Sequence, residues 1–202
     1  MIAIIDYDAG NIKSVEKAIH FLGEEAVITR EKAVLLSADK VILPGVGAFG
    51  DAMEKLRNYG LVDVIKEIVD KGTPFLGICL GLQLMFDSSE ESPGVKGLSI
   101  LPGKIVRFND FDGELKVPQI GWNSLEFPKE SKIFKNIDTG SYVYFVHSYY
   151  LKAENKEDVA ATSDYGIIYD AAVEHENIFA CQFHPEKSSD IGLQILKNFI
   201  EL

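Results

Sequence analysis

The segment around Cys79 has the residue pattern of a nucleophile on a tight turn. Apolar residues at 74–78 predict a buried strand, and an apolar helical pattern follows the cysteine at once. Gly77 and Gly81 flank it in the spacing Gly-x-Cys-x-Gly, which permits a sharp strand-to-helix turn that presents one side chain above a sheet. Free cysteine is only a few per cent thiolate at neutral pH, so it needs a helix N-terminus and a nearby imidazole. We therefore expect an exposed Cys79 sulfur that acts as a nucleophile.

A histidine near the other end of the chain is the candidate base. His184 and Glu186 lie two residues apart, and side chains with that spacing point the same way in an extended segment. Pro185 disfavours a helix at His184 and has no N–H to satisfy, so we expect an extended segment here. A carboxylate beside an imidazole selects its tautomer and stabilises the imidazolium. Cys79, His184 and Glu186 are therefore predicted to form a catalytic triad for acyl transfer to a thiol.

The composition indicates one domain over residues 1–202. With 47% hydrophobic and 25% charged residues and no linker-like shift, the chain can bury a sizeable core. A formal net charge of −11 disfavours a nucleic-acid surface, which needs clustered Lys and Arg. The chain has two cysteines, Cys79 and Cys181, which predicts a reducing, cytoplasmic compartment. Cys181 has apolar neighbours and is expected to lie in the core. The N-terminal apolar run is too short for a signal peptide, and no run has membrane-spanning length.

Short apolar strands alternate with helical stripes in the first half of the chain, which predicts a parallel sheet. The first stripe begins at Ile12, with Asn11 as its candidate cap. Later β-rich segments are expected to add antiparallel strands; they lie at 104–108, 122–127, 142–151 and 178–183. A last helix is predicted at 191–200, preceded by the cap candidates Ser188, Ser189 and Asp190. The predicted fold class is α/β, with three layers: a mainly parallel central sheet flanked by helices, plus antiparallel strands.

A glycine-rich loop at 44–50 follows one of the predicted strands. In open parallel sheets the reactive crevice lies beyond the carboxyl ends of the strands, so this loop and the Cys79 turn are expected to face one pocket. Backbone N–H groups of the loop, that of Val46 among them, and the N–H of Leu80 are candidate donors to a developing oxyanion. The loop lacks the phosphate-loop lysine, and the cysteines and histidines lack metal-ligand spacing, so we expect no cofactor and no metal.

These motifs, in this order, resemble the class I (triad) glutamine amidotransferases across essentially the whole chain. Within that family, further segments are similar to the glutaminase subunits of imidazole glycerol phosphate synthase: 45–50, Gly121-Trp122-Asn123, 144–149 and 185–189. Gln119 departs from the pattern, because the resemblance leads us to expect a histidine there.

The resemblance implies that Cys79 attacks the side-chain amide of glutamine, that His184 moves the proton and that Glu186 orients His184. Ammonia would leave, water would hydrolyse the thioester, and the ammonia would pass to a (β/α)8 barrel cyclase subunit in histidine biosynthesis. By the same resemblance the residues expected to contact glutamine are Gly47, Gln83, Ser148 and Tyr149. Those expected to lie towards the cyclase, in a heterodimer, are Asn11, Trp122, Tyr144 and Lys187.

Two other functions stay open on the residues alone. A free-standing thiol hydrolase, such as an amidase or peptidase, could use the same cysteine and histidine. A non-enzymatic partner protein could retain the fold, although a complete triad argues against it. Simpler interpretations exist for single residues too: Trp122 and Tyr144 could be core aromatics, and His147 is expected to be structural or interfacial.

Overall fold

The N-terminal part of the chain builds the parallel half of a sheet from short apolar strands. The computed structural model describes residues 1–109, 113 and 115–202. Strand β1 (Ile2–Ile5) pairs in parallel with β2 (Ala26–Thr29) and β3 (Lys40–Gly45), and β3 pairs with β4 (Phe75–Cys79). Residues on β1 alternate between the two faces, so that Ile2 and Ile4 join one hydrophobic core and Ala3 and Ile5 the other.

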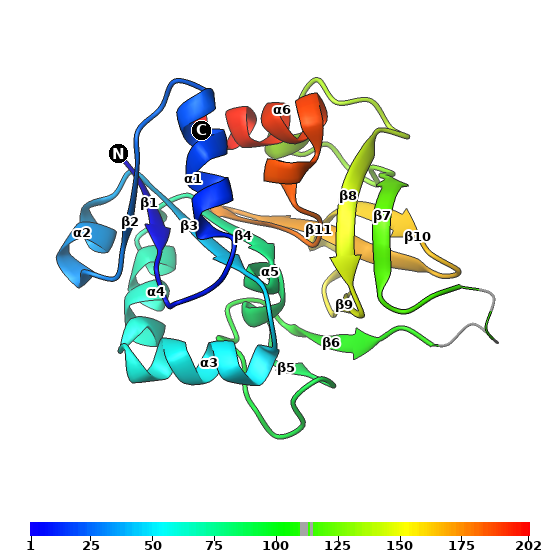
Figure 1. Ribbon diagram of the computed structural model, residues 1–202, viewed down its shortest axis with the longest axis horizontal. Coiled ribbons are helices and arrows are strands. Elements are labelled where there is room, and N and C mark those ends of the chain that lie inside the picture. Colours follow the sequence, from blue (N-terminus) through cyan, green and yellow to red (C-terminus); the bar gives the residue numbers. More distant parts are fainter. Residues whose placement is uncertain (110–112, 114) are drawn as a thin grey trace.

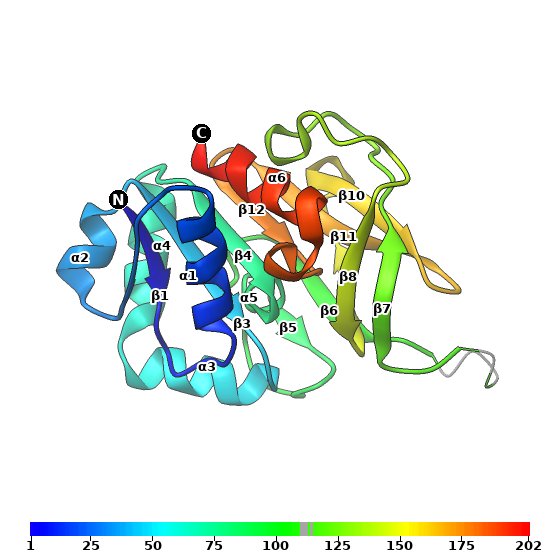
Figure 2. The same ribbon diagram turned by 45° about the horizontal axis from the view of Figure 1, so that its top comes forward.

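Helices cover both faces of this sheet, as Figures 1 and 2 show. One face carries α1 (Ile12–Phe21) and α6 (Ser189–Ile200), which pack against each other. The other face carries α2 (Lys32–Ser37), α3 (Phe49–Asn58), α4 (Leu61–Asp70) and α5 (Leu80–Leu84). Each longer helix buries one apolar stripe, which explains its position: α4 buries Leu61, Val64, Ile65 and Ile68. Within the described residues, no helix is long and apolar enough to cross a membrane.

The later strands extend the same sheet beyond β4. Strand β12 (Ile178–Cys181) pairs with β4 in parallel, and β11 (Ile168–His175) follows it in antiparallel register. The sheet order continues through β9 (Tyr149–Ala153), β6 (Gly103–Arg107) and β5 (Ser88–Ser89), and β10 (Val159–Asp164) pairs with β11. The α/β class with a mainly parallel, helix-flanked sheet and antiparallel additions is confirmed. Short 3-10 turns lie at Lys132–Phe134, Lys156–Asp158 and Pro185–Lys187.

The partners of two predicted strand segments differ from expectation. Strands β7 (Gln119–Ser124) and β8 (Tyr142–His147) form a separate two-stranded antiparallel sheet that packs beside α6 (Figure 2). The segment at 178–183 was expected to be antiparallel, and β12 is antiparallel to β11, but it is parallel to β4 and ends at Cys181. Local patterns favour a strand in both segments, but the partner of a strand is decided by packing between distant parts of the chain.

Three neighbouring strands end at the same edge of the sheet. The register places Gly45 opposite Cys79, and Cys181 opposite Ile78. The residues that follow these strands therefore start from adjacent points, although they are widely separated in sequence. This edge brings together the glycine-rich loop after β3, the turn at Cys79 and the segment that leads to His184.

The turn at Cys79 requires glycine at position 81. A Cβ atom on Gly81 would lie 1.8 Å from the backbone oxygen of Leu43, which is held in β3. We expect Gly81→Ala to lower the free energy of unfolding by about 3 kcal/mol or more, because a backbone strand cannot give way as a side chain can. Urea unfolding measures this. Gly72→Ala is the control: that site has a positive φ but no atom within 4 Å, so its cost should be about 1 kcal/mol. Equal losses in the two variants would contradict the steric argument.

Candidate active site

Cys79 occupies the strained turn that its flanking glycines predict. Its backbone has φ 55° and ψ −109°, and it lies between the end of β4 and the start of α5. Glycine at position 77 serves the same turn, because a Cβ there would lie 2.6 Å from Met85 Sδ and 2.9 Å from Gly81 O. Strain of this kind persists only where the surrounding structure fixes it, and it is concentrated at functional sites.

The sulfur is less exposed than expected. Cys79 was expected to be exposed, but it is only 6% exposed and forms part of the wall of a pocket. It lies at the N-terminus of α5, as expected. Activation of this thiol by that helix end and by a nearby imidazole stays a prediction.

His184 lines the same pocket as Cys79 and is fixed by a carboxylate. Its Nδ1 lies 2.8 Å from Glu186 Oε1, and the side chains of both residues are fully buried. Its Nε2 is buried and has no hydrogen-bond partner within the described part of the chain. Burial acts to lower the pKa of His184, but Cys79 and Glu186 outweigh it and raise that pKa to about 9. The arrangement thus favours the imidazolium form of His184.

The extended segment predicted around His184 is only partly correct. His184 itself is extended, with φ −101° and ψ 96°, but Pro185–Lys187 form a 3-10 turn. The turn still returns the Glu186 carboxylate to the imidazole. Ser188 holds the segment in place: its Oγ donates to His184 O at 2.7 Å and accepts from Tyr144 N at 2.9 Å. The hydroxyl of Ser188 was expected to cap α6, but it makes no cap hydrogen bond there.

Asn11 takes part in the same hydrogen-bond chain. It occupies the N-cap position of α1 in a left-handed conformation, with φ 69°, yet its side chain makes no cap hydrogen bond. Instead Asn11 Nδ2 donates to Glu186 Oε1, the oxygen that also faces His184. The cap interpretation of this side chain is wrong. A tertiary contact across 175 sequence positions has replaced it.

The pocket in front of Cys79 has a volume of about 450 Å³. The residues predicted to contact glutamine all line it: Gly47, Gln83, Ser148 and Tyr149. So do Val46 and Leu80, the candidate oxyanion donors. Gly47 has φ 99°, a conformation that favours glycine, and this turn of the loop lets the backbone border the cavity. These residues come from the loop after β3, from α5 after β4 and from the β8–β9 turn, so the fold supplies one cavity from separate segments. Their individual roles remain predictions.

Three further side chains at this site were not predicted as site residues. Glu91 lines the pocket and accepts a hydrogen bond from Phe49 N at 2.7 Å, at the start of α3. Gln182 is fully buried, and its Nε2 lies 3.7 Å from Cys79 Sγ. His147 also lines the pocket. Glu91 lies in an acidic run that is typical of a solvated loop, and Gln182 in an apolar strand, so neither carries a local signal of function.

His147 is a neutral hydrogen-bonding residue. Burial lowers its pKa to about 4, with a smaller contribution from the charge of His184 and some opposition from the hydrogen bond to Tyr149 O. Its Nδ1 lies 2.7 Å from that carbonyl oxygen, which can only accept, so Nδ1 carries the proton. Nearby, Gln119 is buried and its Oε1 accepts from Tyr169 Oη at 3.0 Å. Gln119, which stands where a histidine was expected, is thus buried and hydrogen-bonded in the core.

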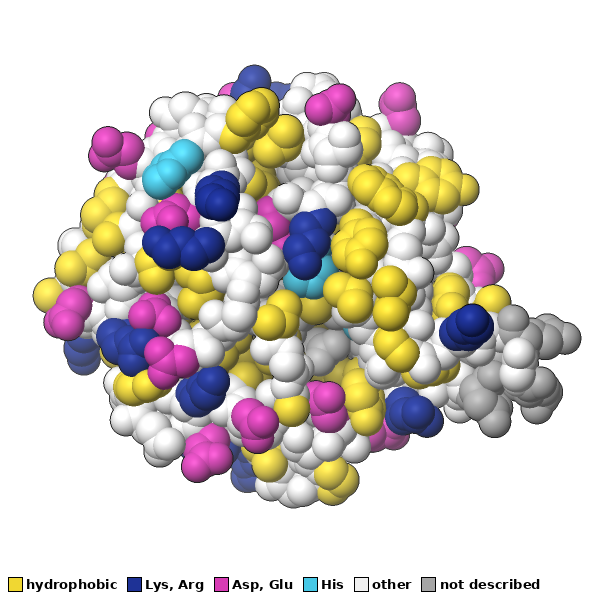
Figure 3. Space-filling view, in the orientation of Figure 1, with side chains coloured by type: hydrophobic (Ala, Val, Ile, Leu, Met, Phe, Trp, Pro, Cys, Tyr) yellow, Lys and Arg dark blue, Asp and Glu magenta, His cyan; other side chains and the backbone are white. Residues whose placement is uncertain are grey.

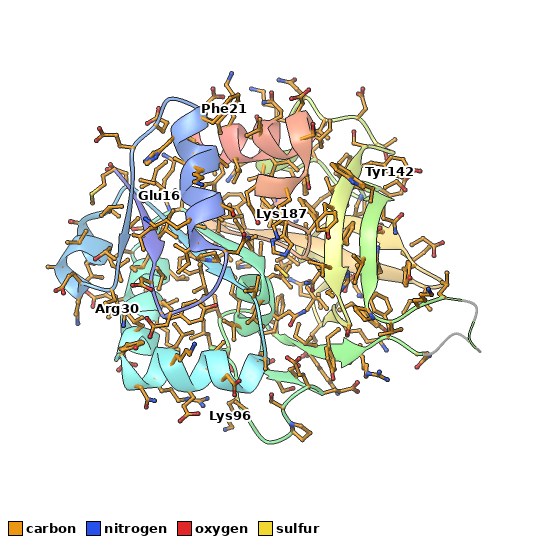
Figure 4. All side chains as sticks on the ribbon, in the orientation of Figure 1. Glu16, Phe21, Arg30, Lys96, Tyr142 and Lys187 are labelled. Atoms are coloured by element: carbon orange, nitrogen blue, oxygen red, sulfur yellow. The ribbon has the colours of Figure 1, made fainter. Side chains whose placement is uncertain are left out.

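The aromatic residues expected to face the cyclase lie on the β7–β8 sheet. Trp122 is 52% exposed, so the alternative of a core tryptophan is wrong. Its ring packs edge-on against Tyr144, with 6.3 Å between centroids. In the space-filling view, apolar side chains gather over this sheet, next to a visible histidine and a basic side chain (Figure 3). Lys187, exposed between α6 and β8, also lines the pocket (Figure 4). An exposed apolar surface thus adjoins the mouth of the pocket.

A cysteine on a strained turn, an imidazole held by a carboxylate and a parallel sheet beneath them agree with the resemblance to the triad glutamine amidotransferases. The family model of Glutamine amidotransferase class-I matches residues 3–202, so the chain belongs to this family. Solved structures agree on the fold: a glutamine amidotransferase crystal structure superposes with a TM-score of 0.77 at 20% identity, covering 100% of this chain and 98% of the other. PurLQS from Thermotoga maritima gives a TM-score of 0.74 at 17% identity, covering 99% and 97%.

Sequence comparison gives a more specific similarity. The chain is 52% identical over 202 residues to imidazole glycerol phosphate synthase subunit HisH of Chlorobaculum tepidum, covering 100% of both chains. It is 46% identical over 202 residues to the protein of the same name from Methanocaldococcus jannaschii, again over 100% of both. The predicted resemblance to the glutaminase subunits of this synthase is confirmed.

Proposed function

We propose that this chain is the HisH-type subunit of imidazole glycerol phosphate synthase, and that it releases ammonia from glutamine for histidine biosynthesis. The observation that carries the chemistry is the buried pair of His184 and Glu186, 2.8 Å apart, with the free Nε2 of His184 in the pocket of Cys79. Full-length similarity to HisH proteins supports the pathway. The reaction belongs in the cytoplasm.

The first half of the reaction forms a thioester. The Cys79 thiolate attacks the side-chain carbonyl carbon of glutamine, and the carbonyl oxygen becomes an oxyanion. Backbone N–H groups of Val46 and Leu80 are the proposed donors to it. The imidazolium of His184 then gives its proton to the leaving nitrogen, the C–N bond breaks and ammonia departs. Glu186 keeps the His184 ring oriented and stabilises its positive charge.

The second half regenerates the cysteine. Neutral His184 takes a proton from a water molecule, whose oxygen attacks the thioester carbon. The C–S bond breaks, the sulfur leaves as a thiolate beside the imidazolium, and glutamate is released. During both halves Gln83, Ser148, Tyr149 and Gly47 are the proposed glutamine contacts, since they line the walls around the sulfur.

Ammonia has to leave without mixing with bulk water, where it would be protonated. The proposed route leads to a (β/α)8 barrel cyclase that covers the pocket mouth in a heterodimer. The apolar surface next to the mouth supports this location, since exposed patches of this kind mark partner sites. The apolar surface comprises Ile120, Trp122, Tyr142 and Tyr144. The polar residues Asn11 and Lys187 are the further proposed contacts with the cyclase.

Mixing the chain with the cyclase subunit of a related synthase tests this function. Glutaminase turnover should rise on adding the cyclase, and glutamine should support cyclisation.

Trp122→Ala should weaken binding of the cyclase by about tenfold or more, because a large exposed ring at an interface centre carries much of the binding energy. Isothermal titration measures the affinity. Phe21→Ala is the matched control, since this ring is 76% exposed but lies at the other end of α1 from Asn11 (Figure 4).

The same experiment distinguishes the proposed function from that of a free-standing thiol hydrolase. Efficient cleavage of peptide substrates by the chain alone, with no response to the cyclase, would contradict the proposed function. Unchanged cyclase affinity in Trp122→Ala would contradict only the proposed surface.

A further inference from the structure

Two glutamine side chains connect the pocket wall to the sulfur of Cys79. Gln83 Nε2 lies 3.1 Å from Tyr149 O and 3.0 Å from Gln182 Oε1. Gln182 Nε2 in turn lies 3.7 Å from Cys79 Sγ. Gln182 is completely buried, and its backbone N–H is bonded to Ala171 O at 2.8 Å. The reaction steps described above make no use of this residue.

The orientation of both amides follows from one carbonyl. The oxygen of Tyr149 can only accept, so the NH2 group of Gln83 must face it. The same NH2 group faces the side chain of Gln182, which must therefore present its oxygen. The remaining end of Gln182, its NH2 group, is then directed at Cys79 Sγ. A donor towards the sulfur is thus required by the hydrogen-bond chain as a whole.

We propose that Gln182 is a positioning residue that holds an N–H donor against the Cys79 thiolate and fixes the amide of Gln83 in the pocket. The inference rests on the proposed function, in which Cys79 is the nucleophile. A hydrogen bond to a charged sulfur is stronger than one to a neutral sulfur. The donor therefore favours the thiolate in the free enzyme, and again when sulfur leaves the thioester. His184 supplies a proton, whereas Gln182 supplies a fixed dipole.

The pH dependence of Cys79 alkylation by iodoacetamide tests this role, with peptide mass spectrometry to resolve it from Cys181. Gln182→Met keeps the size of the side chain but removes donor and acceptor. We expect the midpoint of its profile to move up by about one pH unit, a tenfold change in the thiolate equilibrium. The midpoint is measured because the alkylation rate at a single pH depends on two opposing effects. A more basic thiol is less often ionised, but its thiolate is more nucleophilic.

A second variant separates the two ends of Gln182. Gln182→Glu retains an oxygen for Gln83 Nε2 but places a carboxylate near the sulfur, so its alkylation midpoint should also rise. Its KM for glutamine should stay within about twofold of the unaltered chain. In Gln182→Met, Gln83 loses one of its two acceptors, so KM should rise about fivefold. Gln194→Met, on α6 and away from the pocket, is the matched control and should change neither quantity.

Alkylation midpoints that coincide with that of the unaltered chain in both Gln182 variants would overturn the inference and leave the proposed function intact. Preferential labelling of Cys181 over Cys79 in the unaltered chain would overturn the proposed function itself.

NMR on the unaltered chain provides evidence that needs no variant. The side-chain amide protons of Gln182 should shift with the same midpoint as the alkylation. A resonance that does not respond to pH across that range would contradict the contact.

Discussion

Cys79→Ala is expected to abolish ammonia release from glutamine, with a loss in turnover on the order of a hundred-thousand-fold or more. Removing the sulfur removes the atom that bonds to substrate, so no thioester can form and the remaining groups cannot replace it. The cyclase in the complex should still use added ammonium salt at its normal rate, because the fold that docks it is intact. Coupled assays of glutamate release and of cyclisation with either nitrogen source measure both effects.

Cys181→Ala is the matched control for that variant. Cys181 is fully buried in the sheet, burial raises the pKa of its thiol far above the usual range, and its Sγ lies 3.5 Å from Phe183 O. Its loss should reduce stability modestly and leave glutamine turnover near normal. Substantial glutaminase activity in Cys79→Ala would remove the nucleophile from the proposed mechanism.

His184→Ala is expected to cost nearly as much as Cys79→Ala, and Glu186→Ala about a hundredfold less. The imidazole moves the proton in both halves of the reaction, whereas the carboxylate orients and stabilises the ring through Nδ1. Asn11 also donates to the Glu186 carboxylate, so Glu186→Ala leaves that amide without its acceptor. Steady-state rates with saturating glutamine test the order. A larger loss in Glu186→Ala than in His184→Ala would contradict these roles.

The raised pKa of His184 adds a prediction about stability. This pKa rises from its ordinary value of 6.5 to about 9 in the folded chain, so the folded state holds the proton more tightly than the unfolded state does. The resulting stabilisation is fully present below about pH 6.5 and is lost as the pH rises through about 9. The free energy of unfolding should therefore fall less between pH 6 and pH 9.5 in His184→Ala than in the unaltered chain. Urea unfolding at both pH values measures the difference.

The sequence by itself determined the parts of the site that depend on local sterics. Glycine at positions 77 and 81 is needed because a Cβ there would collide with Met85 and with the backbone of β3, and the Gly-x-Cys-x-Gly spacing reflects this need. The pairing of His184 with Glu186 also spans only two positions. The alternation of apolar strands and helical stripes likewise predicted a parallel sheet, since both signals repeat within a few residues.

Tertiary structure alone decided which distant segments complete the site. The parallel pairing of β12 with β4 brings Gln182 and His184 beside Cys79, about a hundred positions earlier in the chain. Tertiary packing also brings Asn11 into contact with Glu186, and it places Glu91 in the wall of the pocket. A strand pattern specifies which face is apolar but not which strand will be its neighbour, because that choice depends on the packing of the whole sheet and its helices. The same packing separated β7 and β8 from the main sheet and left Trp122 exposed beside the pocket.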